Sequence, residues 1–486
     1  MAEDDNKRVE SSITARKADS FPEWYSQVVI KSRLVDYAPV KGSMAFRPDS
    51  YEIWEAIQSA FNIMIKRTGH RNVYLPLLIP ERLLEIEGEH FKGFKPEVFW
   101  VTMSGNSELS ERLAIRPTSE TIVYYFMAKW IRSWRDLPLL MNQWCNVLRS
   151  EIKDTKPFTR NSEFLWQEGH TAHATADEAE KEVMLIAELY RELMEDYLAM
   201  PVLVGRKSDL EKFPGANYTI TLEALMPDGR ALQAGTSHNL GQNFSKPFNV
   251  AFLDKDSVER NPYTTSWGIS TRLIGGIVMT HGDDKGLVIP PKVAPVEVII
   301  VPIYRDETKD RVLKHANGLL ERITSKGIRA KLDDRDGYTP GWKFNEWELR
   351  GVPIRLEVGP RDMDNSEVVL ARRDDGSKAT VKEDAMLKTI SRELRSIQNA
   401  LLRSARKALK KGITSVRSYK QFKGALDDKK GFIRANWCGS GECELKIKEE
   451  TGATCRLIRL EKEDLFGSCV YCGKDAKHVA YFAKAY

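Results

Sequence analysis

Apolar and polar residues alternate in two short stretches of the first half of the chain, Asn142–Glu151 and Phe164–His170. A period of two is typical of β-strands, whose successive side chains point to opposite faces. The residues between the two stretches are mostly polar and include Pro157, which favours a turn. The pattern predicts an antiparallel hairpin whose first strand carries Arg149 and Glu151 on one face.

The second strand of this hairpin gathers chemically distinctive side chains. Phe164, Trp166, Glu168 and His170 are spaced two residues apart, so they are expected to share one face. A soluble strand seldom exposes large aromatic rings, and a core seldom buries unpaired charges. Two interpretations fit this face. It could hold a structural cross-strand Arg–Glu pair beside half-buried aromatic residues, or it could form a binding site.

Helical and strand patterns surround the hairpin. Apolar residues recur every three or four positions in Tyr51–Thr68, which predicts a helix, and Asn72–Pro80 resembles an edge strand interrupted by prolines. A second apolar helix is expected over Ile122–Trp134. Thr118 and Glu120 lie just before it, where a hydroxyl cap and an acidic first turn are common and where polar groups can also face a ligand.

Two later stretches combine small residues with isolated polar ones. The glycines of Leu232–Phe244 allow the backbone to approach a ligand closely. The candidate polar contacts in this stretch are Gln233, Thr236 and His238. Ser266–Met279 predicts a strand, a turn and a very apolar helix that begins near Arg272. An arginine at the start of such a helix needs an anionic partner.

The second half of the chain has a different organisation. Pro290–Pro295 is a proline-rich linker, and strands alternate with helices beyond it. This alternation predicts a small α/β domain with a largely parallel sheet. A nucleotide-binding domain would have the same pattern, but no glycine-rich phosphate loop follows any of its strands.

Five of the six cysteines lie after residue 437. They include two close pairs, Cys438 with Cys443 and Cys469 with Cys472. Two such pairs are typical of a structural zinc site, because each tight turn presents two thiolates to one tetrahedral ion. Cys455 lies outside both pairs and is expected to be a free thiol.

Composition excludes several classes of protein. The chain has 486 residues, of which 42% are hydrophobic and 29% charged, with a net charge of +5. These values are ordinary for a globular protein of two to four domains, and the charge is too small to indicate nucleic-acid binding by itself. Met1–Ser12 has no apolar leader, and no apolar run is long enough to span a bilayer. We therefore expect a cytoplasmic protein with no membrane partner.

The hairpin also carries a resemblance to a known family. Arg-x-Glu at Arg149, a polar loop and Phe-Leu-Trp-Gln-Glu-Gly-His at Phe164–His170 resemble motif 2 of class II aminoacyl-tRNA synthetases. In this form the second strand resembles prolyl-tRNA synthetases of the archaeal/eukaryotic type. Residues around 60–80 resemble motif 1, which builds a homodimer interface in that family. Residues 266–280 resemble motif 3, although Ser270 departs from the usual glycine pattern of the class.

The resemblance covers nearly the whole chain and implies a multidomain α/β fold. Residues 1–290 are expected to form a class II catalytic core built on an antiparallel sheet of six to seven strands. Residues 296–400 are expected to form an α/β anticodon-binding domain. Residues 401–486 are expected to form a small α/β zinc-binding domain whose terminus, Tyr486, turns back toward the catalytic core.

The same resemblance implies a function. Such enzymes activate proline with ATP to form prolyl-adenylate, and they transfer the prolyl group to the 3′ end of tRNA(Pro). The resemblance also implies Mg²⁺ that bridges phosphates and a structural Zn²⁺. The residues implied as catalytic are Arg149, Glu151 and Arg272. The residues implied for proline are Thr118, Glu120, Arg149, Trp166, Glu168, His170, His238, Trp267 and Gly268. The residues implied for ATP are Arg149, Glu151, Phe164, Gln233, Thr236, Thr271 and Arg272, and those for zinc are Cys438, Cys443, Cys469 and Cys472.

Two alternatives remain open. A sister class IIa enzyme for threonine, glycine or histidine would share the fold, although the catalytic zinc ligands of threonyl enzymes are not evident. A non-catalytic, synthetase-like tRNA-binding protein is the other alternative. Such proteins usually lose the motif arginines, and both Arg149 and Arg272 are present.

Overall fold

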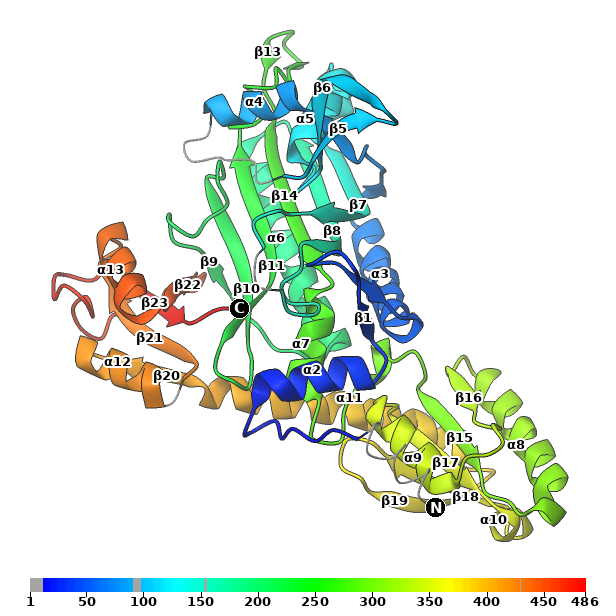
Figure 1. The fold of residues 1–486 in the computed structure, drawn as a ribbon. Coiled ribbons are helices and arrows are strands. Elements are labelled where there is room, and N and C mark those ends of the chain that lie inside the picture. Colours follow the sequence, from blue (N-terminus) through cyan, green and yellow to red (C-terminus); the bar gives the residue numbers. More distant parts are fainter. Residues whose placement is uncertain (1–11, 91–97, 153–154, 429) are drawn as a thin grey trace.

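The computed structural model describes residues 12–90, 98–152, 155–428 and 430–486. The first eleven residues lie outside the described part of the chain, and they make up most of Met1–Ser12, the segment in which no apolar leader was expected. In Figure 1 a long twisted sheet occupies the centre, a smaller α/β unit lies at the lower right, and the C-terminal elements lie at the left.

The central sheet contains the catalytic strands that the sequence predicts. Its order in this region is β3, β7, β8, β14, β11, β10, β9, and all neighbours are antiparallel except β3 and β7. The bounds are β3 (Arg71–Asn72), β7 (Leu139–Leu148), β8 (Glu163–His173), β14 (Tyr263–Ser270), β11 (Ala231–Gly241), β10 (Tyr218–Leu225) and β9 (Leu203–Arg206). The expected antiparallel sheet of six to seven strands is confirmed.

One face of this sheet is covered by helices. These are α2 (Phe21–Lys31), α3 (Pro48–Arg67), α6 (Ala176–Glu192) and α7 (Arg272–His281). Their buried residues, among them Trp54, Phe61, Tyr190 and Ile274, form one hydrophobic core with Trp267 of the sheet. The helices therefore bury one face, and the opposite face of β8, β11 and β14 is left for a site.

Asn72–Pro80, expected as one interrupted strand, forms two strands in different sheets. β3 ends at Asn72, and β4 (Leu78–Pro80) pairs with β6 in a separate three-stranded sheet. Pro76 lies between them and has no N–H to donate to a ladder. The other elements of this region are β5 (Trp100–Ser104), β6 (Ser107–Ile115), α4 (Glu81–His90) and α5 (Glu120–Trp130).

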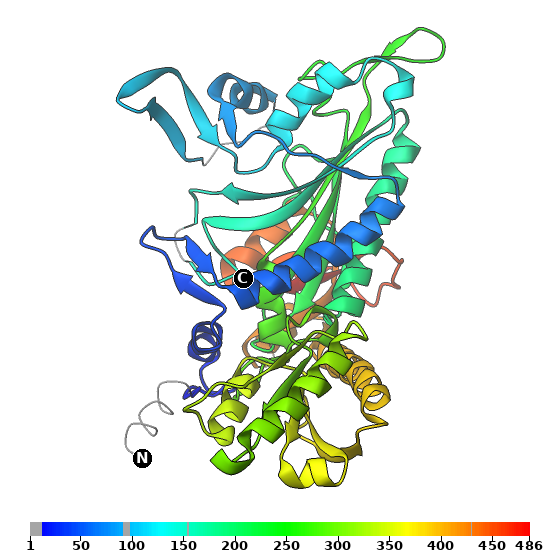
Figure 2. The same ribbon diagram turned by 90° about the vertical axis from the view of Figure 1, so that its right-hand side faces the viewer.

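The remaining short elements of the catalytic region connect these units. They are β1 (Val35–Tyr37), β2 (Met44–Phe46), η1 (Trp134–Asp136), η2 (Leu193–Tyr197), β12 (Phe252–Leu253), β13 (Glu259–Arg260) and η3 (Pro291–Val293). The hairpin of β1 and β2 projects from the body beside the N-terminal helix (Figure 2).

The second unit is the α/β domain that the alternation of strands and helices predicts. Its sheet order is β16, β15, β17, β18, β19, in which the first three strands are parallel and the last two antiparallel. The strands are β15 (Val298–Pro302), β16 (Ala330–Leu332), β17 (Ile354–Val358), β18 (Glu367–Arg372) and β19 (Lys378–Lys382). The helices are η4 (Asp306–Thr308), α8 (Lys309–Thr324), α9 (Pro340–Leu349), α10 (Pro360–Asp364) and α11 (Met386–Lys411). Because α11 runs across residue 400, it connects this unit to the next.

The C-terminal unit extends the catalytic sheet. Its strands are β20 (Ile413–Val416), β21 (Phe432–Trp437), β22 (Thr454–Arg459) and β23 (His478–Ala483), and its helices are α12 (Tyr419–Asp428) and α13 (Gly441–Thr451). β22 pairs with β9, so that one sheet of 11 strands runs through both units. The chain end returns as the resemblance implied, since the Tyr486 hydroxyl donates to Asp228 at 2.6 Å.

Candidate active site

A cavity of about 560 Å³ lies on the open face of the central sheet. Strands β8, β11 and β14 contribute to its walls, together with the segment before α5 and residues between β9 and β10. The expected site residues that line it are Thr118, Glu120, Arg149, Glu151, Phe164, Trp166, Glu168, Gln233, Thr236, His238, Trp267, Gly268 and Arg272. The structure thus brings residues from five separate stretches of sequence into one cavity.

Strand register explains why these side chains converge. On β8, Trp166 faces Ser270 and Glu168 faces Gly268 of β14, so alternate residues of both strands reach the same face. Gly268 leaves space there. A Cβ atom at this position would lie 3.1 Å from the Gln167 carbonyl and 3.7 Å from the Trp166 ring.

The first strand of the hairpin is shorter than the sequence indicated. β7 ends at Leu148, so Arg149 and Glu151 lie in the connection rather than on a strand face. The Arg149 N–H still donates to the Ser162 carbonyl at 2.8 Å, which extends the pairing by one residue. Both side chains line the cavity, but they reach it from the connection and not from the shared strand face that the sequence predicted.

Trp267 borders the cavity, but its ring points away from it. Its neighbours Ser266 and Gly268 take the open face, and its ring packs on the opposite face against Phe61 and Tyr190. Alternation along β14 requires this arrangement.

His170 and Thr271 lie behind the cavity. The His170 imidazole contacts the Glu168 carboxylate at 3.2 Å and is 3% exposed. Thr271 is fully buried at the start of α7. Neither residue lines the cavity, because both are covered by the residues in front of them.

Two half-buried arginines face the cavity, and within the described residues neither has a carboxylate in ion-pair contact. The Arg149 Nε donates to the Pro117 carbonyl, and its guanidinium lies over the rings of Phe164 and Trp166 at 5.3 and 5.4 Å from their centroids. Arg272 donates to the main-chain carbonyls of Thr159 and Gln233. Within the described residues neither guanidinium forms an ion pair with a carboxylate.

Partial loss of hydration disfavours the charge on both arginines. Loss of hydration lowers the pKa of Arg149, although Glu151, Glu120 and Glu168 partly oppose the change. Loss of hydration and repulsion from Arg149 lower the pKa of Arg272 to about 10. A polyanion in the cavity would relieve both effects.

Glu120 and Glu168 bring carboxylates into the same cavity. Glu120 accepts a hydrogen bond from the Thr118 hydroxyl. Burial raises the pKa of Glu168, but hydrogen bonding and the charge of His170 outweigh this and lower it to about 2. The cavity therefore combines cationic groups with carboxylates, and the charge of Arg149 interacts with both Glu120 and Glu168.

The sequence interpretation missed several residues of the cavity. Phe213 and Lys207 line it, and the Phe213 ring lies 4.7 Å from that of His238. Burial, Lys207 and His170 lower the pKa of His238 to about 3, so its imidazole is neutral. Segment 207–214 has no periodic pattern, and no residue-level signal distinguished it from a loop.

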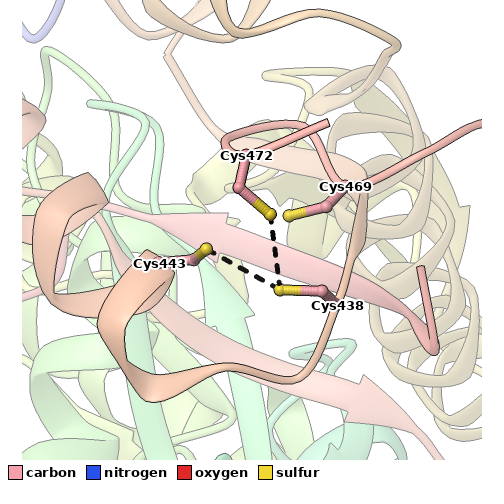
Figure 3. Close-up of side chains that lie close together, drawn as sticks. All are labelled: Cys438, Cys443, Cys469 and Cys472. Atoms are coloured by element: carbon pink, nitrogen blue, oxygen red, sulfur yellow. Dashed lines mark hydrogen bonds between the residues drawn. The ribbon is translucent and has the colours of Figure 1, made fainter. Parts of the chain in front are cut away.

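Figure 3 shows the four cysteines of the two predicted pairs pointing toward one another. Their sulfur atoms lie within 4.8 Å of each other, with Cys438 at 3.7 Å from Cys443 and 3.9 Å from Cys472. A tetrahedral Zn²⁺ with Zn–S bonds of ~2.3 Å requires sulfur separations of ~3.8 Å. The donor set and spacing fit this ion, and Cys455 lies outside the cluster.

Among the helices of the described residues, none is both long and apolar enough to cross a bilayer.

Comparison with known proteins identifies the parts of the fold. The family "tRNA synthetase class II core domain (G, H, P, S and T)" matches residues 99–281, and "Anticodon binding domain" matches residues 297–393. "Prolyl-tRNA synthetase, C-terminal" matches residues 419–486. Fold, cavity and matches together define a class II aminoacyl-tRNA synthetase.

Individual relatives narrow this class. The chain is 54% identical to the proline–tRNA ligase of Cenarchaeum symbiosum, over 98% of this chain and 99% of that protein. It is 52% identical to that of Alkaliphilus oremlandii, over 99% of both. The crystal structure of prolyl-tRNA synthetase from Cryptosporidium parvum, complexed with halofuginone and AMPPNP, has a TM-score of 0.92 at 44% identity and covers 98% of this chain and 97% of that one. The chain belongs to the prolyl-tRNA synthetase family and is an aminoacyl-tRNA ligase.

Proposed function

We propose that this chain activates proline with ATP to prolyl-adenylate and transfers the prolyl group to the 3′ end of tRNA(Pro). The observation that carries the proposal is the pair of half-buried guanidiniums, Arg149 and Arg272, which line one cavity without an ion-paired carboxylate within the described residues. A triphosphate would neutralise both. Phosphoryl transfer of this kind depends on positioning and charge neutralisation more than on a general base.

The nucleotide occupies the arginine end of the cavity in this proposal. Arg149 neutralises the α-phosphate, where the proline carboxylate attacks, and Arg272 binds the γ-phosphate. Phe164 stacks on adenine. Gln233 and Thr236 contact the nucleotide, and the exposed Glu151 at the cavity edge would hold a Mg²⁺, which would neutralise phosphate charge. The C. parvum relative contains an ATP analogue, which supports this assignment.

Proline occupies the carboxylate end. Thr118 and Glu120 bind its cationic secondary amine. Trp166, Glu168, His238 and Gly268 enclose the ring, with Phe213 packed on His238 as an additional wall. His170 supports this pocket from behind, and Trp267 borders the pocket while its ring packs behind the sheet.

ATP–pyrophosphate exchange with each standard amino acid tests the substrate. We expect proline to give the highest kcat/KM, because a compact apolar wall beside a carboxylate suits a small ring with a cationic amine. Threonine, glycine or histidine as best substrate would replace this proposal by a sister enzyme. Exchange with no amino acid would favour the non-catalytic, tRNA-binding alternative.

We also propose the assembly and domain organisation that the resemblance implies. Residues 1–290, 296–400 and 401–486 would serve as catalytic, anticodon-binding and zinc-binding domains, which the three family matches support. A homodimer would form through the motif 1 region. That region carries exposed apolar side chains at Tyr51, Ile63, Tyr74 and Leu78. None of the six cysteines, all of which lie in the described residues, forms a disulfide, which fits a cytoplasmic location.

We infer that the four-cysteine cluster binds one structural Zn²⁺. Four thiolates leave no open coordination position, so such an ion stabilises the fold and does not polarise a substrate. Cys472→Ser is expected to abolish stoichiometric zinc binding and lower the thermal stability of the C-terminal unit. Proline-dependent exchange should persist, because the cavity residues lie in other elements.

The control for this prediction is Cys455→Ser, which removes a buried thiol outside the cluster. Elemental analysis should find one zinc per chain in the wild type and in this control. Absence of zinc from wild-type protein purified without chelator would contradict the inference. So would complete loss of exchange in a Cys472→Ser protein that remains folded.

A further inference from the structure

Gln143 lies at the centre of β7 and is 1% exposed. It faces Glu168 across the ladder between β7 and β8. Its Oε1 accepts the Leu75 N–H, and its Nε2 donates to the Glu168 carboxylate at 2.9 Å and to the Ser119 hydroxyl at 3.0 Å. A main-chain N–H can only donate and a carboxylate can only accept, so these partners fix the orientation of the amide.

One side of Gln143 holds the segment between β3 and β4. Leu75 is 1% exposed, and its carbonyl accepts a hydrogen bond of 2.7 Å from the buried Arg116. Its neighbour Tyr74 is 75% exposed, and Leu78 is 39% exposed. The segment is therefore fixed internally by two buried side chains and presents apolar side chains to the outside, where the proposed dimer partner would lie.

The other side of Gln143 holds the amino-acid end of the cavity. Glu168 accepts the Ser119 N–H at 3.1 Å, and Ser119 lies between Thr118 and Glu120. One amide group thus fixes the relative position of β8 and the start of α5. These two elements carry the carboxylates assigned to proline.

We propose that Gln143 is a positioning residue that couples the motif 1 segment to the proline pocket. The placement of Leu75, set by dimer formation, determines where Gln143 holds Glu168 and Ser119. Gln143 itself does not line the cavity and acts only through these two residues. The proposal rests on the proposed function, because both proline binding and the homodimer belong to it.

The first test replaces Gln143 by methionine, which keeps the volume and removes the amide. Loss of a hydrogen bond to a charged group is expected to raise the KM for proline about 10- to 100-fold. The KM for ATP should change less than about twofold, because the arginine end is untouched. A purely structural role would lower the amount of folded enzyme without separating the two KM values.

Gln167→Met is the matched control. Gln167 is fully buried one strand away, but its amide lies on the helix-covered face and bonds to Asn142 and Tyr190. This control should lose stability with an unchanged KM for proline. Gln143→Glu is the second variant, since it keeps an acceptor for Leu75 and places a carboxylate against Glu168. It should raise the KM for proline at least as much as methionine does.

The coupling is tested with Tyr74→Glu, which places a charge on the exposed motif 1 surface. Sedimentation should show that Tyr74→Glu weakens the dimer. Tyr74→Glu alone should raise the KM for proline, whereas adding it to Gln143→Met should cause no further rise. Additive effects of Tyr74→Glu and Gln143→Met on the KM for proline would overturn the inference. So would equal KM values for Gln143→Met and Gln167→Met. If the wild-type protein sediments as a monomer, both the coupling and the homodimer are wrong. If the wild-type protein shows no proline-dependent exchange, the proposed function is wrong instead.

Discussion

Arg149→Ala is expected to reduce proline-dependent ATP–pyrophosphate exchange on the order of 10²–10³-fold or more. Arg149 is a half-buried cation whose guanidinium lies over two aromatic rings, and its charge would stabilise the negative charge that develops on the α-phosphate. Exchange kinetics at saturating ATP and proline measure the effect on kcat.

The loss should not come from unfolding. Burial already disfavours the charge of Arg149, and Arg272 repels it, so the folded state gains no ion pair from this side chain. We expect a cooperative thermal transition near that of the wild type. Arg403→Ala, at an exposed position of α11, is the control and should leave exchange unchanged. Exchange within a few-fold of wild type for Arg149→Ala would exclude it from the phosphate site.

Glu223→Gln is expected to lower the free energy of unfolding by about 3–5 kcal/mol. Glu223 is fully buried in β10 and binds Arg456 of β22 through both carboxylate oxygens, with the Nη2 atom at 3.0 Å from each. Lys207 also lies 3.5 Å from it. Neutralising this carboxylate leaves two buried cations without their counter-charge, at the junction of the catalytic and C-terminal units.

Denaturant unfolding measures this loss. The control is Glu461→Gln, because Glu461 pairs with Arg459 of the same strand at 3.8 Å but its side chain is 86% exposed. Such surface pairs contribute about 0–1 kcal/mol. Equal, small effects of the two substitutions would show that the buried cluster does not hold the two units together.

The sequence predicted most of the open face of the site because the hairpin strands alternate clearly. Phe164, Trp166 and Glu168 line the cavity as the spacing of two requires. The direction of the Trp267 ring carried no sequence signal, because β14 is largely buried on both faces. Where both faces of a strand are buried, the pattern of apolar and polar positions no longer distinguishes one face from the other. Which side chains face the cavity then depends on the register with the neighbouring strands.

Other features depend on contacts between distant parts of the chain. The two cysteine pairs carry a spacing signal and were found in advance. The pairing of β22 with β9 has no such signal, because it joins residues about 250 positions apart through only Ile458 with Arg206 and Arg459 with Gly205. Gln143 is one glutamine in an apolar strand, and its role is visible only when Leu75, Ser119 and Glu168 are placed around it.

The continuity of the 11-stranded sheet has a consequence for the order of synthesis. β9 lies at the edge of the catalytic strands until β22 pairs with it, and β22 begins at Thr454. A growing chain therefore completes every residue of the cavity while one side of its main sheet still exposes unpaired N–H and carbonyl groups. Such an edge is a template for pairing with other chains. We therefore expect the pairing of β22 with β9 to close this edge of the catalytic sheet against other nascent chains.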